Sequence, residues 1–228
     1  MPVASFEILL NSINAYPIIE ALANPQDCVT LDLSIDNEAL LNINISSSKD
    51  LDNYITNYIT YNKAKLAYGG YLEKRGIYKR SEYFNELDTK KERNIHLGTD
   101  IWISEETPVF APLDGIIHSF NNNTNYGDYG PTIILEHKIN DYMFYTLYGH
   151  LSIESITDKI VGVEVKSGMQ IGTLGSANVN GDYPPHLHFQ VIKDIQNYKG
   201  DYPGVTNEND LEFYKSNCPN PNALLRHY

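Results

Sequence analysis

The sequence predicts a mainly β protein, with an antiparallel β-sheet core over residues 93–195 and an α+β extension over residues 1–92. Short β-branched runs, punctuated by Gly, Pro and Asn, follow one another after Arg93, which is typical of antiparallel strands joined by turns. Helical and alternating periodicities are mixed before Arg93. The prolines of residues 196–228 leave room for little regular structure, so this tail is expected to pack on the core.

The N-terminal extension begins with helical spacing and continues with two alternating runs. Apolar residues recur at mostly helical intervals between Phe6 and Ala23, and Pro17 interrupts them, so we expect two short helices. Residues 31–35 and 41–45 alternate apolar and polar side chains strictly, which predicts two half-buried strands.

A longer helix and an irregular connector complete the extension. Apolar side chains within residues 51–65 form one stripe, which predicts an amphipathic helix, and Ser46–Ser48 offer N-caps before it. The tyrosine-rich residues 68–92 predict a connector without regular structure. No recognisable catalytic constellation falls in this extension. Whether residues 68–88 cover a groove and keep the core latent is left open by the sequence.

Seven short runs predict the strands of the core: residues 108–111, 115–120, 132–137, 143–148, 162–165, 170–174 and 187–192. They are rich in β-branched and aromatic residues, and turn-forming residues separate them. The polar loop 121–128 is expected at the rim of the sheet. After the last run, only a short helix around residues 209–216 is expected.

The charge balance argues against a nucleic-acid partner. Lys and Arg total 17 against 29 Asp and Glu, a formal net charge of −12, whereas nucleic-acid binding needs a basic surface. The one basic cluster, Lys74-Arg75 to Lys79-Arg80, is short and is interpreted as a solvated surface. The 18 tyrosines are typical of strands and half-buried surfaces, and they also suit a groove for peptides.

Cysteine usage and hydropathy bear on the compartment. Cys28 and Cys218 are too few for a disulfide framework, so both are expected to be thiols. No apolar run approaches the ~20 residues of a membrane span. Residues 1–7 lack the features of a signal peptide, so a cytoplasmic location is expected, with export by another route left open. The sequence does not determine the oligomeric state.

Four histidines and one aspartate of the core indicate a site that could bind a metal ion and transfer protons. His186 and His188 lie two residues apart in an apolar, β-prone run, so on a strand both imidazoles share one face. His96 and Asp100 are four residues apart, which on a strand also places them on one face, and Gly98 leaves space between them.

These side chains are ordinary zinc donors. His96, Asp100 and one of the two histidines at positions 186 and 188 would supply three protein ligands and leave a fourth position open, as in a catalytic zinc site. Zinc with an open position lowers the pKa of its bound water and polarises a carbonyl. Such a site needs a proton acceptor, and His150, beside Gly149 at an expected strand end, presents one.

Four motifs in this order carry a resemblance to a known family. They are His96-Leu97-Gly98-Thr99-Asp100, Tyr148-Gly149-His150-Leu151, the glycine-spaced turn of residues 168–175, and His186-Leu187-His188. Together they resemble the lysostaphin/LytM-type zinc metallopeptidases over about residues 95–192, and residues 108–117 match the same framework. The resemblance implies a bacterial protein with a lysostaphin/LytM-like β core of the duplicated-hybrid-motif type.

The resemblance also implies a role for each site residue. His96, Asp100 and His188 would bind one zinc ion per chain. His150 and His186 would flank the metal-bound water, one as general base and the other steadying the oxyanion or donating a proton to the leaving amine.

A narrower resemblance concerns the peptidase-like domain found inside long cytoplasmic fusion proteins. Residues 93–98, 129–135 and 145–150 carry it, and the tail at residues 202–205 and 218–222 fits the same subset. Those fusion proteins also contain an aminotransferase and a kinase-like phosphotransferase domain. This sequence has neither, so neither chemistry is carried over.

Two functions of different classes follow. The first is a zinc-dependent endopeptidase that hydrolyses short glycine- or D-amino-acid-containing peptides, such as those of cell-wall peptidoglycan, with a peptide or peptidoglycan fragment as its partner. The alternative is a cytoplasmic hydrolase of other amides, or a module that binds a metal and a ligand without peptidase activity.

Several other polar residues are expected to lie outside the site. We expect a surface or structural role for His118, His137 and His227, a β-turn rather than an acid at Asp114-Gly115, and loop solvation rather than a groove lining for Asn122, Asn125 and Tyr126.

Overall fold

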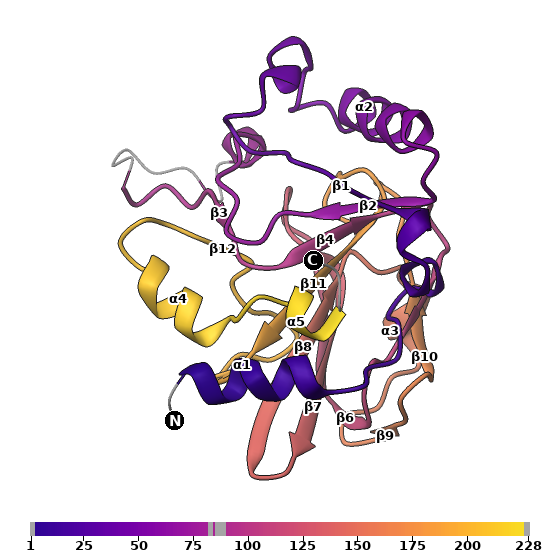
Figure 1. Ribbon diagram of the computed structural model, residues 1–228, viewed down its shortest axis with the longest axis vertical. Coiled ribbons are helices and arrows are strands. Elements are labelled where there is room, and N and C mark those ends of the chain that lie inside the picture. Colours follow the sequence, from indigo (N-terminus) through magenta and orange to yellow (C-terminus); the bar gives the residue numbers. More distant parts are fainter. Residues whose placement is uncertain (1–2, 82–83, 85–89, 226–228) are drawn as a thin grey trace.

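The computed structural model describes residues 3–81, 84 and 90–225 and is built around one eight-stranded sheet (Figure 1). All neighbouring strands in this sheet run antiparallel except β1 and β2, which are parallel. The predicted mainly β fold is therefore confirmed. In spatial order the strands are β1 (Cys28–Thr30), β2 (Leu66–Gly69), β4 (Thr99–Trp102), β11 (His186–Ile192), β8 (Tyr142–Gly149), β7 (Gly130–Ile139), β6 (Gly115–Asn123) and β9 (Glu164–Val165).

Two pairs of short strands flank the main sheet. One joins β5 (Pro108–Phe110) to β10 (Gln170–Thr173), and the other joins β3 (Ile95–His96) to β12 (Val205–Thr206). In the second pair His96 lies opposite Val205. The C-terminal tail therefore fixes the position of the first histidine of the predicted site.

Helices lie mainly in the first third and at the end of the chain. The α-helices are α1 (Val3–Ser12), α2 (Ser48–Tyr61), α3 (Glu154–Thr157), α4 (Leu211–Asn217) and α5 (Asn222–Leu225), and the 3₁₀ turns are η1 (Glu20–Ala23), η2 (Pro25–Asp27), η3 (Glu38–Asn42) and η4 (Ile77–Arg80). The two helical segments expected around Pro17 correspond to α1 and η1. The predicted amphipathic helix is α2, and the side chain of Ser47 accepts the capping hydrogen bond from the Asp50 backbone N–H.

Two predicted strands of the extension are wrong. Leu31 and Leu33 are buried in alternation as expected, but the Leu33 N–H donates to the carboxylate of Glu73 at 3.0 Å instead of to a neighbouring strand. Residues 41–45 fall on η3 and the turn after it, where the Asn37 side chain accepts from the Ala39 N–H. At Leu33 a side-chain acceptor replaces the ladder partner that a strand requires. Over residues 41–45 local backbone carbonyls replace it, because the Ile43 N–H donates to Leu40 and the Ile45 N–H donates to Ile43.

The extension joins the same sheet as the core residues. Strand β2 pairs with β4, placing Gly69 opposite Asp100, so the connector leaves the sheet directly beside the predicted site. Helix α2 lies over this edge of the sheet (Figure 1) and buries Leu51 and Ile55 among Leu31 and other apolar residues of the extension. Full burial of each such side chain stabilises the fold by about 1.5–3 kcal/mol.

Strand β11 separates the apolar core from the site. Leu187 and Phe189 are fully buried in the main hydrophobic cluster, together with Phe6 of α1 and Phe144 of β8. Because side chains alternate along a strand, His186 and His188 face the opposite side. The predicted division of this strand into a core face and a histidine face is confirmed.

The structure agrees with the expectations of free cysteine thiols and of no membrane-spanning helix among the described residues. Both cysteines of the chain, Cys28 and Cys218, are free thiols. Among the described residues, none of the helices has the length and apolar character that crossing a membrane requires.

Candidate metal centre and active site

Three neighbouring segments bring the predicted metal ligands together. His96 ends β3, Asp100 lies in β4, and His188 lies opposite Asp100 in the β4–β11 ladder. The expectation that His96 and Asp100 share one continuous strand is wrong, because the chain leaves strand geometry at Leu97 and Gly98. The two side chains nevertheless converge, since β3 pairs with β12 while β4 pairs with β11.

The three donor atoms form a small triangle. His96 Nε2 lies 2.8 Å from His188 Nδ1 and 3.2 Å from Asp100 Oδ1, and His188 Nδ1 lies 3.0 Å from the same oxygen. Nitrogen and oxygen ligands of a tetrahedral zinc ion stand roughly 3.3 to 3.5 Å apart. A small outward movement of these atoms would therefore accommodate the ion. The residues present fit zinc in number, type and spacing.

The protonation of the two imidazoles also favours a cation. His96 Nδ1 lies 2.9 Å from the Gly70 carbonyl oxygen, which only accepts, so the proton of His96 is on Nδ1. His188 Nε2 donates to Gln190 Oε1 at 3.1 Å. The nitrogens facing the triangle therefore carry lone pairs, and burial lowers the pKa of His96 to about 4, which keeps it neutral. Three acceptors facing one another repel unless a cation lies between them.

Sequence reasoning missed the outer contacts that orient His188. Gln190, two residues further along β11, presents its oxygen to His188 because its Nε2 donates to the Pro203 carbonyl at 3.2 Å and to the Cys218 sulfur at 3.2 Å. The Tyr129 hydroxyl lies 3.4 Å from the same His188 nitrogen. Such partners fix the tautomer and ring orientation of a metal-ligating histidine. The i, i+2 spacing of His188 and Gln190 was the available signal.

The interpretation of the basic cluster as a solvated surface is wrong for both of its arginines. The Arg75 side chain is only 4% exposed, and its Nη1 donates to Asp100 Oδ2. The Arg80 side chain is 2% exposed and lies over the Tyr183 ring, 4.2 Å from its centroid. Arginine is favoured at such sites because its planar guanidinium stacks on rings and pairs with carboxylates. Nothing in the local sequence distinguishes these two arginines from surface ones.

Asp100 is ionised although it is buried. Burial disfavours its charged form, yet the Arg75 guanidinium beside it holds the pKa of Asp100 well below its usual range. The carboxylate is therefore available as a metal ligand with one oxygen while the other is held by Arg75.

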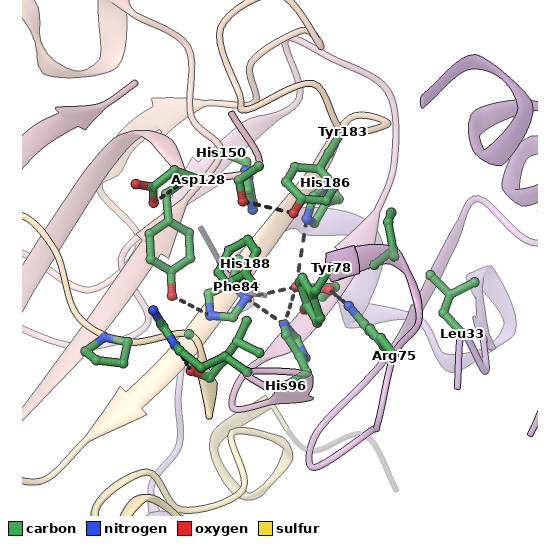
Figure 2. Close-up of a pocket in the computed structure, with 18 of the residues that line it drawn as sticks. Leu33, Arg75, Tyr78, Phe84, His96, Asp128, His150, Tyr183, His186 and His188 are labelled. Carbon is green, nitrogen blue, oxygen red and sulfur yellow. Dashed lines mark hydrogen bonds and ion pairs between the residues drawn. The ribbon is translucent and has the colours of Figure 1, made fainter. Parts of the chain in front are cut away.

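The two remaining histidines lie side by side above the triangle. The ring centroids of His150 and His186 are 4.2 Å apart, and His186 Nε2 is 3.9 Å from Asp100 Oδ1. Each Nδ1 donates to a backbone carbonyl, that of Asn180 at 2.8 Å and that of Pro184 at 2.7 Å. Figure 2 shows these two rings and the ligand histidines around one point.

Both of these histidines are suited to accept a proton. Because each Nδ1 carries its hydrogen, each Nε2 keeps a free lone pair. Burial lowers the pKa of His150 well below its usual range and also lowers that of His186. Both rings are therefore neutral near pH 7.

The backbone at His150 is held in an unusual conformation. Its φ is 63°, in the left-handed region that non-glycine residues rarely adopt. Two hydrogen bonds enforce it: the His150 N–H donates to the Tyr129 carbonyl at 2.9 Å, and the Gly175 N–H donates to the His150 carbonyl at 2.9 Å. Strain of this kind persists where the surroundings over-determine the position, as they do at functional sites. It directs the imidazole toward the other histidines.

A cavity of about 160 Å³ lies over the five predicted site residues. Aromatic side chains form much of its wall, among them Tyr129 and Tyr183 from the core and Tyr78 and Phe84 from the connector. The predicted site residues are 2–5% exposed, so they lie deep in this pocket. The abundance of tyrosine was the only sequence signal for these walls.

Gly98 is required by a close approach, as its sequence position suggested. A Cβ at this position would lie 2.5 Å from Cε1 and 2.6 Å from Nε2 of His188, and 2.8 Å from the Phe189 carbonyl oxygen. The backbone next to His96 therefore packs directly on the ring of the third ligand.

Replacing Gly98 with alanine is expected to weaken zinc binding and to destabilise the fold by about 1–3 kcal/mol, because the His188 ring must tilt away from the triangle. Zinc titration and urea unfolding would measure the two effects. Gly76→Ala is the matched control, since a Cβ there meets only the Ile45 and Ile35 side chains, at 3.2 and 3.8 Å. Equal zinc affinity in the two variants would contradict the prediction.

The other polar residues considered from sequence lie outside the site. His137 is buried between the Asp114 carbonyl and the Thr146 hydroxyl, and His118 contacts Ser119. The Asp114 carboxylate accepts from the Ser167 N–H. The cavity wall includes none of the three described loop residues Asn122, Asn125 and Tyr126. His227 lies outside the described residues.

Comparison with known proteins bears on the same segment. The model of peptidase family M23 matches residues 94–200, which include all five predicted site residues. Residues 94–200 therefore form a domain of peptidase family M23. The resemblance inferred from the motifs between His96 and His188 is therefore confirmed, and with it the class of the domain, a metallopeptidase.

Three similar proteins illustrate the family. The peptidoglycan DD-endopeptidase ShyC of Vibrio cholerae is 35% identical over 98 residues, which are 42% of this chain but 20% of that protein. The catalytic domain of lysostaphin from Staphylococcus simulans is 30% identical, with 54% of this chain and 80% of that chain covered and a TM-score of 0.38. A zinc-containing peptidase from Vibrio cholerae is 29% identical, with 46% of this chain and 31% of that chain covered and a TM-score of 0.34. The chain thus spans about a fifth of the length of its full-length relative.

Proposed function

We propose that this M23 chain is a zinc-dependent endopeptidase that hydrolyses short glycine- or D-amino-acid-containing peptides of the kind found in bacterial cell walls. The observation that carries the proposal is the triangle of His96 Nε2, Asp100 Oδ1 and His188 Nδ1, with lone pairs facing inward, beside two further neutral imidazoles. The name of the V. cholerae relative, a peptidoglycan DD-endopeptidase, supports the substrate class.

The ligand residues prepare the site for zinc. His96, Asp100 and His188 would hold the ion, which when bound supplies a Lewis acid and lowers the pKa of a coordinated water. The Gly70 carbonyl and Gln190 keep the histidine lone pairs directed at the site. Asp100 contributes a negative charge that two neutral histidines do not.

His150 and His186 would handle the protons of hydrolysis. The free Nε2 of one accepts the proton that the attacking water loses, and the same proton is then delivered to the nitrogen of the departing amine. Their Nδ1 hydrogens stay on the carbonyls of Asn180 and Pro184, which fixes both rings. Once a ring has accepted a proton on Nε2, that Nε2–H also donates toward the developing oxyanion.

Cleavage assays with pentaglycine and with cross-linked muropeptides would test this proposal. The zinc-loaded chain is expected to cleave at least one of them, and the chelator-treated chain neither. One zinc per chain with no cleavage of either substrate would reject the wall-peptidase proposal while leaving the metal site in place.

The depth of the site favours one alternative, a hydrolase of small amides other than wall peptides. The five site residues are only 2–5% exposed beneath a pocket of about 160 Å³, so a small amide reaches them more readily than a cross-linked muropeptide does. Cleavage of dipeptides, with no cleavage of muropeptides, would favour this alternative over the wall peptidase. A cytoplasmic location is proposed with it, and cell fractionation would test that part separately.

A further inference from the structure

We propose that Arg75, which lies outside the segment matched to the family, is a positioning residue for the metal ligand Asp100. The inference rests on the metal site of the proposed function and not on its substrate. Arg75 belongs to the connector that follows β2, whereas the family match begins at residue 94. Part of the metal centre would therefore be supplied by the N-terminal extension.

The two oxygens of Asp100 have separate partners. Oδ1 belongs to the donor triangle, 3.0 Å from His188 Nδ1 and 3.2 Å from His96 Nε2. Oδ2 accepts from Arg75 Nη1 at 2.5 Å. A carboxylate that is free to rotate would exchange its oxygens or offer both. The contact with Arg75 fixes its plane, so that one oxygen points toward the zinc position.

Arg75 is itself held from several sides. Its Nε donates to Glu73 Oε2 at 2.5 Å, and the other oxygen of Glu73 accepts from the Leu33 N–H at 3.0 Å. The guanidinium carbon lies over Trp102, 5.5 Å from the ring centroid. The Arg75 backbone N–H donates to the Asn94 carbonyl at 2.8 Å. These contacts form a continuous chain from Leu33 through Glu73 and Arg75 to Asp100.

Arg75 is needed for charge balance as well as for geometry. Asp100 and Glu73 are both largely buried carboxylates, with side chains 3% and 11% exposed. Arg75 lies between them and compensates part of their charge in a region from which water is largely excluded. Without it Asp100 Oδ2 would lose its hydrogen-bond donor, and the carboxylate would be stabilised in other orientations, which do not suit a ligand.

The fork shape of arginine matters here. One planar group donates through Nε to Glu73 and through Nη1 to Asp100, while Nη2 has no partner among the described residues. A lysine ammonium is a single point on a flexible stem and does not reproduce two fixed directions. Arg75→Lys therefore keeps the positive charge and removes the geometry.

Zinc affinity of the full chain, measured by competition with a chromogenic chelator, would test the inference. Arg75→Ala and Arg75→Lys are expected to bind zinc 10- to 100-fold more weakly than the natural chain, the usual effect of losing a partner of a metal ligand. Arg80→Ala and Arg80→Lys are matched controls. Arg80 is an equally buried arginine of the same connector, and its polar contacts are with Gly181 and Asp182.

A second measurement separates positioning from folding. The visible spectrum of the cobalt-substituted protein reports the ligand geometry, and it is expected to change in Arg75→Lys but not in Arg80→Lys. Thermal unfolding of the zinc-free variants would show whether both have lost similar stability. If Arg75→Ala fails to fold, the zinc affinity and the cobalt spectrum of Arg75→Lys alone decide the result.

The outcomes distinguish this inference from the proposed function. If the natural chain binds no zinc, the metal site of the proposed function fails. If it binds zinc and the Arg75 variants bind equally tightly, or no more weakly than the Arg80 variants, the positioning role alone is overturned. Neither result depends on which peptide the enzyme cleaves.

Discussion

Replacing His96 with alanine is expected to abolish zinc binding and peptide hydrolysis together. His96 supplies one corner of the donor triangle, and its Nδ1–H is already directed to the Gly70 carbonyl. Removing it leaves two protein ligands where a catalytic zinc site has three. The loss of zinc affinity should exceed the roughly 10- to 100-fold that loss of an outer partner causes.

Zinc content per chain after dialysis and cleavage of the peptide substrates would measure this effect. His118→Ala is the control, because His118 is a half-buried histidine that contacts Ser119 and Tyr145 away from the site. Zinc retained at one ion per chain in His96→Ala would show that the triangle is not the metal site. Circular dichroism would exclude simple unfolding.

Replacing His150 with asparagine is expected to leave zinc content unchanged and to lower kcat by roughly 100- to 10,000-fold, the usual contribution of general acid–base catalysis. His150 faces the site but is not one of the three donors that form the triangle. Asparagine is the substitution of choice because the backbone at this position has φ of 63°, a conformation that asparagine tolerates better than alanine does.

Steady-state kinetics beside metal analysis would check the result. His186→Asn is expected to behave in the same direction, because the two rings lie together and both have a free Nε2. If both variants keep full turnover, the proton-transfer role proposed for these histidines is wrong. If zinc is lost with activity, one of these histidines is a ligand instead.

The sequence by itself determined the series of core strands and the residues that meet at the site. Alternation on a strand is a local rule, so it assigned His186 and His188 to one face and Leu187 and Phe189 to the core. Helical spacing of apolar residues is a local pattern too, and it predicted α2 and its serine cap. Where the backbone finds other partners, the Glu73 carboxylate for Leu33 and a local turn carbonyl for Ile43, the alternating pattern predicted strands that are not present.

Only the tertiary structure decided how these residues are oriented and enclosed. His188 presents Nδ1 to the donor triangle because Gln190 and Tyr129 occupy its other nitrogen. Arg75 reaches Asp100 because β2 pairs with β4, a contact between segments about thirty residues apart. Burial and hydrogen-bond partners are set by the whole fold, whereas a sequence pattern records only which side chains are available. The sequence therefore predicted which side chains meet at the site, and the fold decided their protonation, their partners and their burial.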